Sequence, residues 1–200
     1  RDQFGAAESS VATQTGRDPY DLIAEEAATA PAGAEGLIWL PYLTGERTPH
    51  KDANAKGVLF GLTARHTRAH VFRAIMEGVA YGMRDSLDLM KGLKVPVKQI
   101  RLTGGGSRSA LWRQIQADIY GQEVVTINIE AGPAFGAALI AGVGVGLYKD
   151  FPSVCKQMIK VNKKVKPVPK NKAVYEKGYE LYRALYPALR DSMKKAAEMG

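Results

Sequence analysis

Cysteine is almost absent from this chain of 200 residues: Cys155 is the single example, so no disulfide can form within the chain. A lone cysteine favours a reducing compartment, and we expect a cytoplasmic protein. Long apolar runs are absent as well. A membrane-spanning helix needs about 20 consecutive, mostly apolar residues, and no such run occurs in the sequence, so we expect no membrane partner.

Acidic residues are scarce in the last quarter of the sequence. Residues 1–148 hold 15 Lys or Arg and 15 Asp or Glu, whereas 149–200 hold 13 and 5, which accounts for the net charge of +8. The lysines there flank Pro167 and Pro169 without a recognition helix or aromatics spaced for stacking. We therefore interpret 149–173 as a solvated basic connector before a C-terminal helix over 174–200, and expect no nucleic-acid partner.

Glycine is concentrated at one point in the middle of the chain. Gly104, Gly105 and Gly106 lie between a predicted strand over 97–103 and a predicted helix over 109–120. Without side chains, the backbone of such a turn can approach a ligand closely, and the free N–H groups of the helix start can bind a polar or anionic group. On the triplet alone, a tight turn with nothing bound is an equally good interpretation.

Hydrophobic periodicity predicts the other elements. A helix is predicted over 67–90, with five apolar residues on one stripe: Val71, Ile75, Val79, Met83 and Leu87. The sequence also predicts strands over 37–40 and 123–127, a long ordered loop over 42–56, a helix that begins at Asp18-Pro19, one that ends at Ala141, and a last helix over 175–195 interrupted near Pro187. This alternation with glycine turns predicts an α/β fold with parallel strands.

Several motifs together resemble one known family. They are PYLTGERTPH at 41–50, GVLFGL at 57–62 with HVFRAIME at 70–77, LTGGGSRSALWRQIQADIYG at 102–121 and GPAFGAA at 132–138. In this order they are similar to the FGGY family of carbohydrate kinases, over a motif-bearing core of about residues 37–147. The first motif is most like the branch that acts on xylulose.

The resemblance implies a fold and an assignment of nucleotide and sugar binding to different domains. Residues 1–200 would form the C-terminal, nucleotide-binding domain of an actin-like, ribonuclease H-like sugar kinase, incomplete at its N-terminus. ATP and Mg²⁺ would be the cofactors, and the sugar would bind mainly to the missing first domain. The family's catalytic base is an aspartate that would lie upstream of Arg1, so we expect no catalytic residue, no metal site and no kinase activity in this chain alone.

The same resemblance names the expected nucleotide-binding residues. Gly104, Gly105 and Gly106 match the family's adenosine motif, and Ser109 falls where some members carry an asparagine that contacts the base. A helix N-cap is at least as good an interpretation of Ser109. We expect Trp112 to belong to the core rather than to stack on adenine.

Other polar residues are expected to be structural. We expect neither Asp118 nor Glu77 to act as a general base. Asp85 and Asp88 are expected to face solvent. Glu46 and Arg47 are expected to hold the loop over 42–56 in shape through their polar contacts. His66 and His70 are spaced as metal ligands can be, but the sequence offers no third ligand nearby.

Three functions remain open at this point. The first is the nucleotide-binding half of an ATP-dependent kinase for a pentulose, with D-xylulose as the expected substrate. The second is a sister kinase for gluconate, ribulose, fuculose or glycerol. The third is a non-catalytic actin-like module that binds nucleotide or a partner chain. A homodimer is one possible assembly.

Overall fold

The computed structural model describes residues 4–129 and 132–199. Its α-helices are α1 (Ala6–Thr15), α2 (Pro19–Ala28), α3 (Arg68–Gly92), α4 (Ala110–Tyr120), α5 (Gly132–Gly144), α6 (Phe151–Met158) and α7 (Lys172–Ala197). Its strands are β1 (Ile38–Leu40), β2 (Val58–Phe60), β3 (Ile100–Leu102), β4 (Val124–Ile127) and β5 (Val161–Val165). Three short 3₁₀ helices are η1 (Ala34–Gly36), η2 (Gly105–Arg108) and η3 (Pro169–Asn171).

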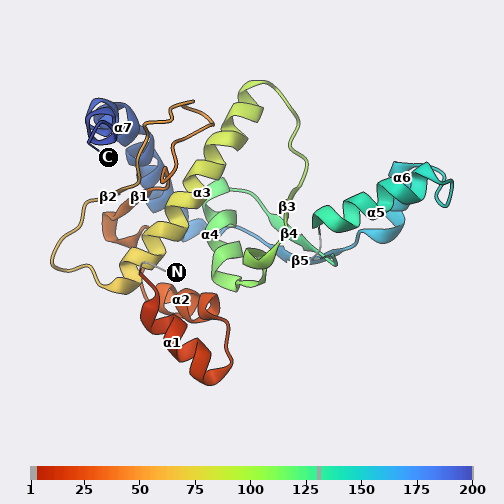
Figure 1. The fold of residues 1–200 in the computed structure, drawn as a ribbon, viewed down its shortest axis with the longest axis horizontal. Helices are drawn as coiled ribbons and strands as arrows, with labels where there is room; N and C mark the ends of the chain where they lie inside the picture. Colours follow the sequence, from red (N-terminus) through yellow and green to blue (C-terminus); the bar gives the residue numbers. More distant parts are fainter. Residues whose placement is uncertain (1–3, 130–131, 200) are drawn as a thin grey trace.

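The strands form two small sheets (Figure 1). In one sheet β3 and β4 are parallel, with Ile100 opposite Val124, and α4 connects them, which confirms the predicted strand–helix–strand unit. β5 adds to β4 in the antiparallel direction. In the other sheet β1 pairs antiparallel with β2.

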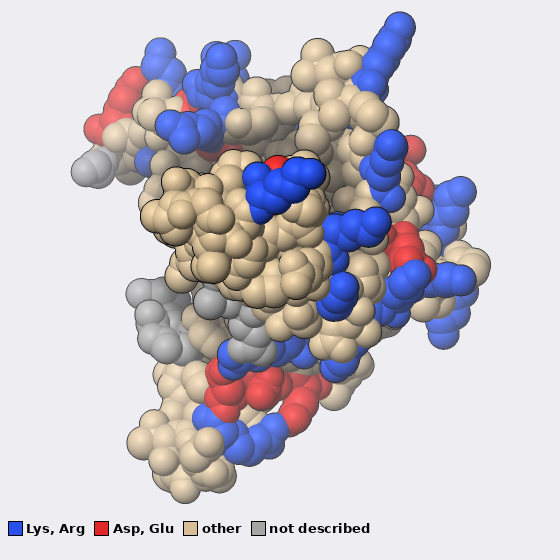
Figure 2. Space-filling view, turned by 90° about the vertical axis from the view of Figure 1, so that its right-hand side faces the viewer, with Lys and Arg blue, Asp and Glu red and all other residues tan. Residues whose placement is uncertain are grey.

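The lysine-rich segment 149–173 is more ordered than the sequence suggests. It contains α6, β5 and η3, so our interpretation of it as a plain connector is wrong in its secondary structure. Its solvation is as expected, because four of the five β5 residues are exposed, Lys163 and Lys164 among them. Lys and Arg side chains spread over this side of the molecule in separate groups, with acidic side chains between them (Figure 2).

Helix α3 runs through the middle of the molecule and packs against β1, α2 and α4. It approaches β1 so closely that a Cβ on Gly78 would lie 2.1 Å from the carbonyl oxygen of Trp39. The face buried most deeply is not the predicted apolar stripe. It carries several polar side chains, including Arg73, Glu77 and Asp85, whereas Met83 of the stripe is 45% exposed.

Helix α7 packs against α3 through a row of tyrosines. Tyr175, Tyr179, Tyr182 and Tyr186 are buried and pack with Tyr42 and Tyr81. The helix continues through Pro187, so the interruption predicted there is wrong. Pro187 lies on the exposed side, while Met193, one and a half turns later, is again buried.

Helices α5 and α6 project from the rest of the molecule (Figure 1). In α5 only Leu139 and Gly142 are buried among the described residues, while Ala137, Ala138 and Ala141 are exposed. The small residues of α5 at these three positions therefore do not pack against the sheet.

Within residues 4–129 and 132–199, no helix combines the length and the apolar composition that crossing a bilayer requires.

Candidate functional site

A cavity of about 520 Å³ opens beside the glycine triplet. Four elements line it: α2, α3, η2 and the start of α4. Its lining residues are Asp18, Tyr20, Asp21, Ile23, Ala24, Ile75, Met76, Val79, Gly105, Gly106, Arg108, Ser109 and Trp112. Its volume lies within the range of small-molecule sites, roughly 300–1,000 Å³.

The glycine triplet forms a 3₁₀ turn rather than an open loop. Gly104 has a φ of 79°, a conformation that favours glycine, and its carbonyl accepts hydrogen bonds from the backbone N–H and the hydroxyl of Ser107. A Cβ on Gly105 would find no atom of the described residues within 4 Å, so this backbone faces open space. A Cβ on Gly106 would lie 3.2 Å from the indole of Trp112. The turn thus presents bare backbone to the cavity.

Ser109 is the N-cap of α4. Its side chain accepts a hydrogen bond from the backbone N–H of Trp112, at 3.3 Å. The capping interpretation of Ser109 is therefore correct, and the same residue also lines the cavity.

Arg113 supports the turn from behind, a role that the sequence analysis missed. This buried guanidinium donates to the carbonyl oxygens of Ser107 and Arg108, at 2.6 and 2.7 Å. Both carbonyls belong to η2, so Arg113 ties the glycine turn to α4. The only signal in the sequence was a cationic residue on the apolar side of the predicted helix.

Five lining residues from α2 and α3 give the cavity an apolar wall: Ile23 and Ala24 from α2, and Ile75, Met76 and Val79 from α3. Trp112 lines the cavity and also packs against the main hydrophobic core, so it is part of both the cavity wall and the core. An apolar wall beside bare backbone suits a flat, weakly polar ring, because the ring gains burial and the backbone can satisfy its edge.

Asp18 and Asp21 give the α2 rim acidic character. Asp18 caps α2, since its carboxylate accepts a hydrogen bond from the backbone N–H of Tyr20, at 2.8 Å. Hydroxyl groups of a ligand are better partners for this rim than a phosphate. Arg108 lies on the η2 side of the same cavity.

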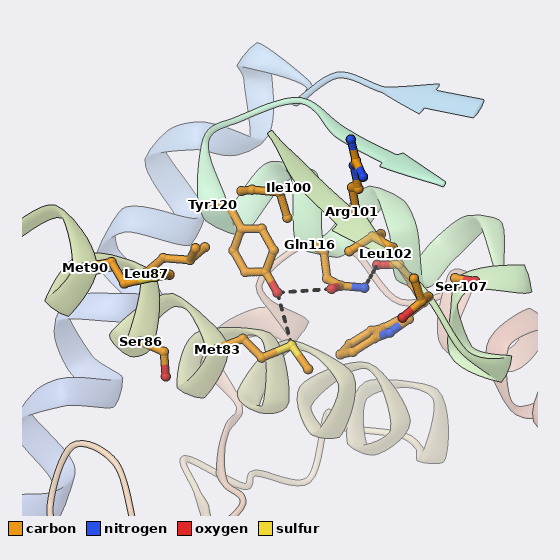
Figure 3. A pocket seen from close by; sticks show the side chains of 12 residues that line it. Met83, Ser86, Leu87, Met90, Ile100, Arg101, Leu102, Ser107, Gln116 and Tyr120 are labelled. Atoms are coloured by element: carbon orange, nitrogen blue, oxygen red, sulfur yellow. Dashed lines mark hydrogen bonds between the residues drawn. The ribbon is translucent and has the colours of Figure 1, made fainter. Parts of the chain in front are cut away.

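A second cavity, of about 370 Å³, lies between α3, β3 and α4 and shares Trp112 with the first (Figure 3). Five of its twelve lining residues are methionine or aliphatic: Met83, Leu87, Met90, Ile100 and Leu102. The Tyr120 hydroxyl lies 3.1 Å from both Gln116 and the sulfur of Met83, and burial raises the pKa of this tyrosine. The described residues that line it include no carboxylate or histidine.

The apolar stripe of α3 lines both cavities. Ile75 and Val79 face the first cavity, and Met83 and Leu87 face the second. The prediction that these residues share one face of a helix is correct. They are only partly buried because this face borders the two cavities.

The acidic side chains considered as bases are engaged in structure. Asp118 accepts hydrogen bonds from Gln114, the backbone N–H of Val168 and Asn171, all at 2.7 Å. Asp85 is buried, which corrects the expectation that it faces solvent. The Tyr179 hydroxyl donates to it at 2.6 Å, and burial raises the pKa of Asp85.

The loop over 42–56 is ordered by its own polar groups, as expected. Glu46 accepts a hydrogen bond from the backbone N–H of Thr48 at 2.7 Å and pairs through its backbone with Asp52. The ring of His50 stacks on Tyr186 at 3.7 Å, and Tyr186 donates to Asp52 at 2.7 Å. These residues hold the loop against α7 and do not line the first cavity.

His66 and His70 act in local capping. Their Nδ1 atoms accept hydrogen bonds from the backbone N–H groups of Thr63 and Thr67, respectively. Within the part of the chain that the structure describes, no three His, Cys, Asp or Glu side chains are grouped so as to hold a metal ion.

The chain is similar to proteins of known family. Residues 2–145 match the C-terminal domain of the FGGY family of carbohydrate kinases. A xylulose kinase from Staphylococcus epidermidis is 38% identical over 169 residues, which cover 84% of this chain and 34% of that protein.

Solved structures give the same result. A xylulose kinase from Lactobacillus acidophilus has a TM-score of 0.79 and 36% identity, over 96% of this chain and 39% of that one. A gluconate kinase from the same organism has a TM-score of 0.76 and 34% identity, over the same shares of the two chains. The present chain therefore spans little more than a third of the relatives that it matches.

Proposed function

We propose, from the premise that this chain belongs to the FGGY family of carbohydrate kinases, that it is the nucleotide-binding part of an ATP-dependent sugar kinase. The fold is accordingly that of the family's C-terminal domain, in part. In the intact protein the reaction would transfer the γ-phosphoryl group of ATP to a pentulose, with D-xylulose as the preferred acceptor. Similarity to xylulose kinases over most of this chain supports that choice.

The observation that carries the nucleotide assignment is the cavity beside the glycine turn. Bare backbone at Gly105 and Gly106 lines the same cavity as an apolar wall that includes Ile23 and Met76. We assign the base of the nucleotide to this wall and the adjoining sugar hydroxyls to the rim with Asp18. Gly104 and Ser109 shape the turn, the first by its backbone conformation and the second by its cap.

The phosphates would leave the cavity past the N-terminal end of α4. Backbone N–H groups at a helix start favour negative charge, and Arg108 adds a cation on the same side. Mg²⁺ would be held by the phosphates and by residues from elsewhere in the protein, because the described residues provide no cluster for a metal. The residues of this chain thus bind and orient the nucleotide.

The base that receives the proton of the attacked hydroxyl would also come from the remainder of the protein. Glu77 and Asp118 are each occupied by three hydrogen-bond donors. Neither lines the nucleotide cavity. A base must lie within hydrogen-bond reach of the proton that it removes.

We assign the exposed small face of α5 to contact with the remainder of the protein. Ala137, Ala138 and Ala141 let another helix approach closely. Closure of the two parts about this contact would exclude water from the reaction, which protects the phosphoryl group from hydrolysis.

A sister activity on gluconate is the second candidate. A gluconokinase from Bacillus subtilis is 37% identical over 155 residues, which is close to the identity with the xylulose kinases. Coupled ADP release from the intact protein with D-xylulose, gluconate and glycerol tests the choice. Preferred turnover of gluconate would keep the family and change the substrate, whereas binding of nucleotide without turnover of any sugar would favour a non-catalytic module.

A further inference from the structure

The strongest unassigned feature of the molecule is a buried ion pair between α2, α3 and α7. Arg73 and Glu77 lie one turn apart on α3, with 2.8 Å between Nε and Oε1, and they are 7% and 2% exposed. Tyr175 of α7 joins them, because its hydroxyl donates to Glu77 at 2.8 Å and accepts from Arg73 at 2.9 Å. Burial raises the pKa of Glu77, while Arg73 and the other donors favour its ionised form.

Both charged groups also bind the segment that follows α2. Arg73 donates to the carbonyl oxygen of Ala30 at 3.1 Å, and Glu77 accepts from the backbone N–H of Gly33 at 3.0 Å. The pair therefore holds this segment at two points, one of them two residues beyond the end of α2.

The segment needs such support because its backbone is strained. Four successive residues, Gly33, Ala34, Glu35 and Gly36, have φ values of 81°, 44°, 52° and 88°. Positive φ is unfavourable for residues other than glycine and persists only where the surroundings enforce it. Gly33 is further confined by α7, since a Cβ there would lie 2.5 Å from Val174.

We infer that Arg73 and Glu77 are positioning residues for the nucleotide cavity, which rests on the function proposed above. The α2 wall, with Ile23 and Ala24, ends at the segment that the pair holds, and the α3 wall, with Met76, lies on the same helix as the pair. The pair thus sets the separation of the two walls. Neither charged residue is among those that line the cavity.

A second ion pair provides a matched control. Arg84 of α3 donates to Glu176 of α7 at 2.7 Å and to the carbonyl oxygen of Ile119 at 3.0 Å. This pair also connects α3 to α7, but within the described residues none of its hydrogen bonds reaches α2. If both pairs only anchor α3 to α7, variants of either pair should have the same effect on nucleotide binding. If Arg73 and Glu77 position the cavity, only their variants should weaken nucleotide binding.

The test compares variants of the intact kinase. Removing one charge would leave the other buried without its partner, so the main variant replaces both, as Arg73→Met with Glu77→Leu. Tyr175→Phe is a milder companion, and Glu176→Gln is the control. We expect the KM for ATP to rise about tenfold in the double variant, with kcat and the KM for sugar within about twofold, as loss of uniform nucleotide binding requires.

Hydrogen exchange gives a readout that does not depend on turnover. Amides of residues 19–36 should exchange faster in the double variant than in the wild type, and should be unchanged in Glu176→Gln. Unchanged exchange in a folded double variant, or an equal rise in the KM for ATP in the control, would overturn the positioning role. If the wild type shows no ATP-dependent turnover, the proposed function fails, and the exchange data still decide whether the pair positions α2.

Discussion

The backbone of Gly106 lies directly against the indole of Trp112, and a methyl group on Gly106 would come within 3.2 Å of two ring atoms. A methyl group on the neighbouring Gly105 would have no atom of the described residues within 4 Å. Two adjacent glycines thus differ in what they require. At Gly106 the missing side chain makes room for the indole of Trp112, whereas at Gly105 the space is open to a ligand.

Gly105→Val tests whether that space belongs to the nucleotide. The protein can accept the new side chain, since it enters open space, but a bound ligand would lose that volume. In the intact kinase we expect the KM for ATP to rise at least about tenfold, with little change in the KM for sugar. Steady-state kinetics with each substrate varied in turn measures both.

Gly92→Val is the matched control, because Gly92 also has open surroundings and lies outside the cavity. It should leave the KM for ATP unchanged. An unchanged KM for ATP in Gly105→Val would remove the triplet from the nucleotide site.

Ser109→Ala separates the two roles of that residue. Loss of the cap on α4 should lower the free energy of unfolding by about 1 kcal/mol, measured by urea denaturation of this chain. Ser109→Asp should retain most of the stability, because aspartate is an equally good N-cap. If Ser109 acts only as a cap, neither variant changes the KM for ATP in the intact kinase.

The stacking of His50 on Tyr186 predicts a pH dependence of stability. Burial lowers the pKa of His50 below its ordinary value of 6.5, and Arg183 lowers it further, although Asp85, Glu46 and Asp52 oppose the shift. Between the lowered pKa and about 6.5 the unfolded chain binds more protons than the folded chain, so stability is lost as the pH falls through this range.

His50→Phe keeps a stacking ring and removes the titrating group. The thermal midpoint of the wild type should therefore fall more than that of the variant between about pH 7.5 and 5.5. Parallel curves for the two proteins would show that His50 is not responsible for the slope.

Ala137→Leu tests the proposed contact of α5. Because Ala137 is exposed, the variant should fold as stably as the wild type. Adding the remaining part of the kinase in trans should rescue sugar-dependent ADP release with the wild-type chain, and Ala137→Leu should weaken this rescue. Ala184→Leu makes the same change on an exposed face of α7 and should leave the rescue intact. An equal effect of both variants would argue against α5 as the contact.

The elements predicted well were those with a strong local signal. Helix α3 begins one residue after the predicted Thr67, which is its N-cap, and the Asp18-Pro19 pair begins α2 as predicted. The glycine turn lies between a strand and a helix as expected. In each case the capping residue or the apolar repeat lies within the element itself, so the sequence alone carries the information.

The features that were missed depend on partners far away in the sequence. β5 reads Val161–Val165 with exposed lysines, so its strand character comes from pairing with β4 and not from alternation. Asp85 looked solvent-exposed because its partner, Tyr179, lies 94 residues away. The α2 wall of the cavity could not be predicted either, because the local sequence around Ile23 and Ala24 does not indicate that they lie near the glycine turn.

The chain has two tryptophans, and the structure separates their surroundings. Trp39 lies against Gly78 of α3, whereas Trp112 lines the cavity beside the glycine turn, to which we assign the nucleotide. Replacing Trp39 by phenylalanine would therefore leave Trp112 as the single tryptophan of these 200 residues. Emission from Trp112 would then report nucleotide entry directly, without a label and without a sugar acceptor.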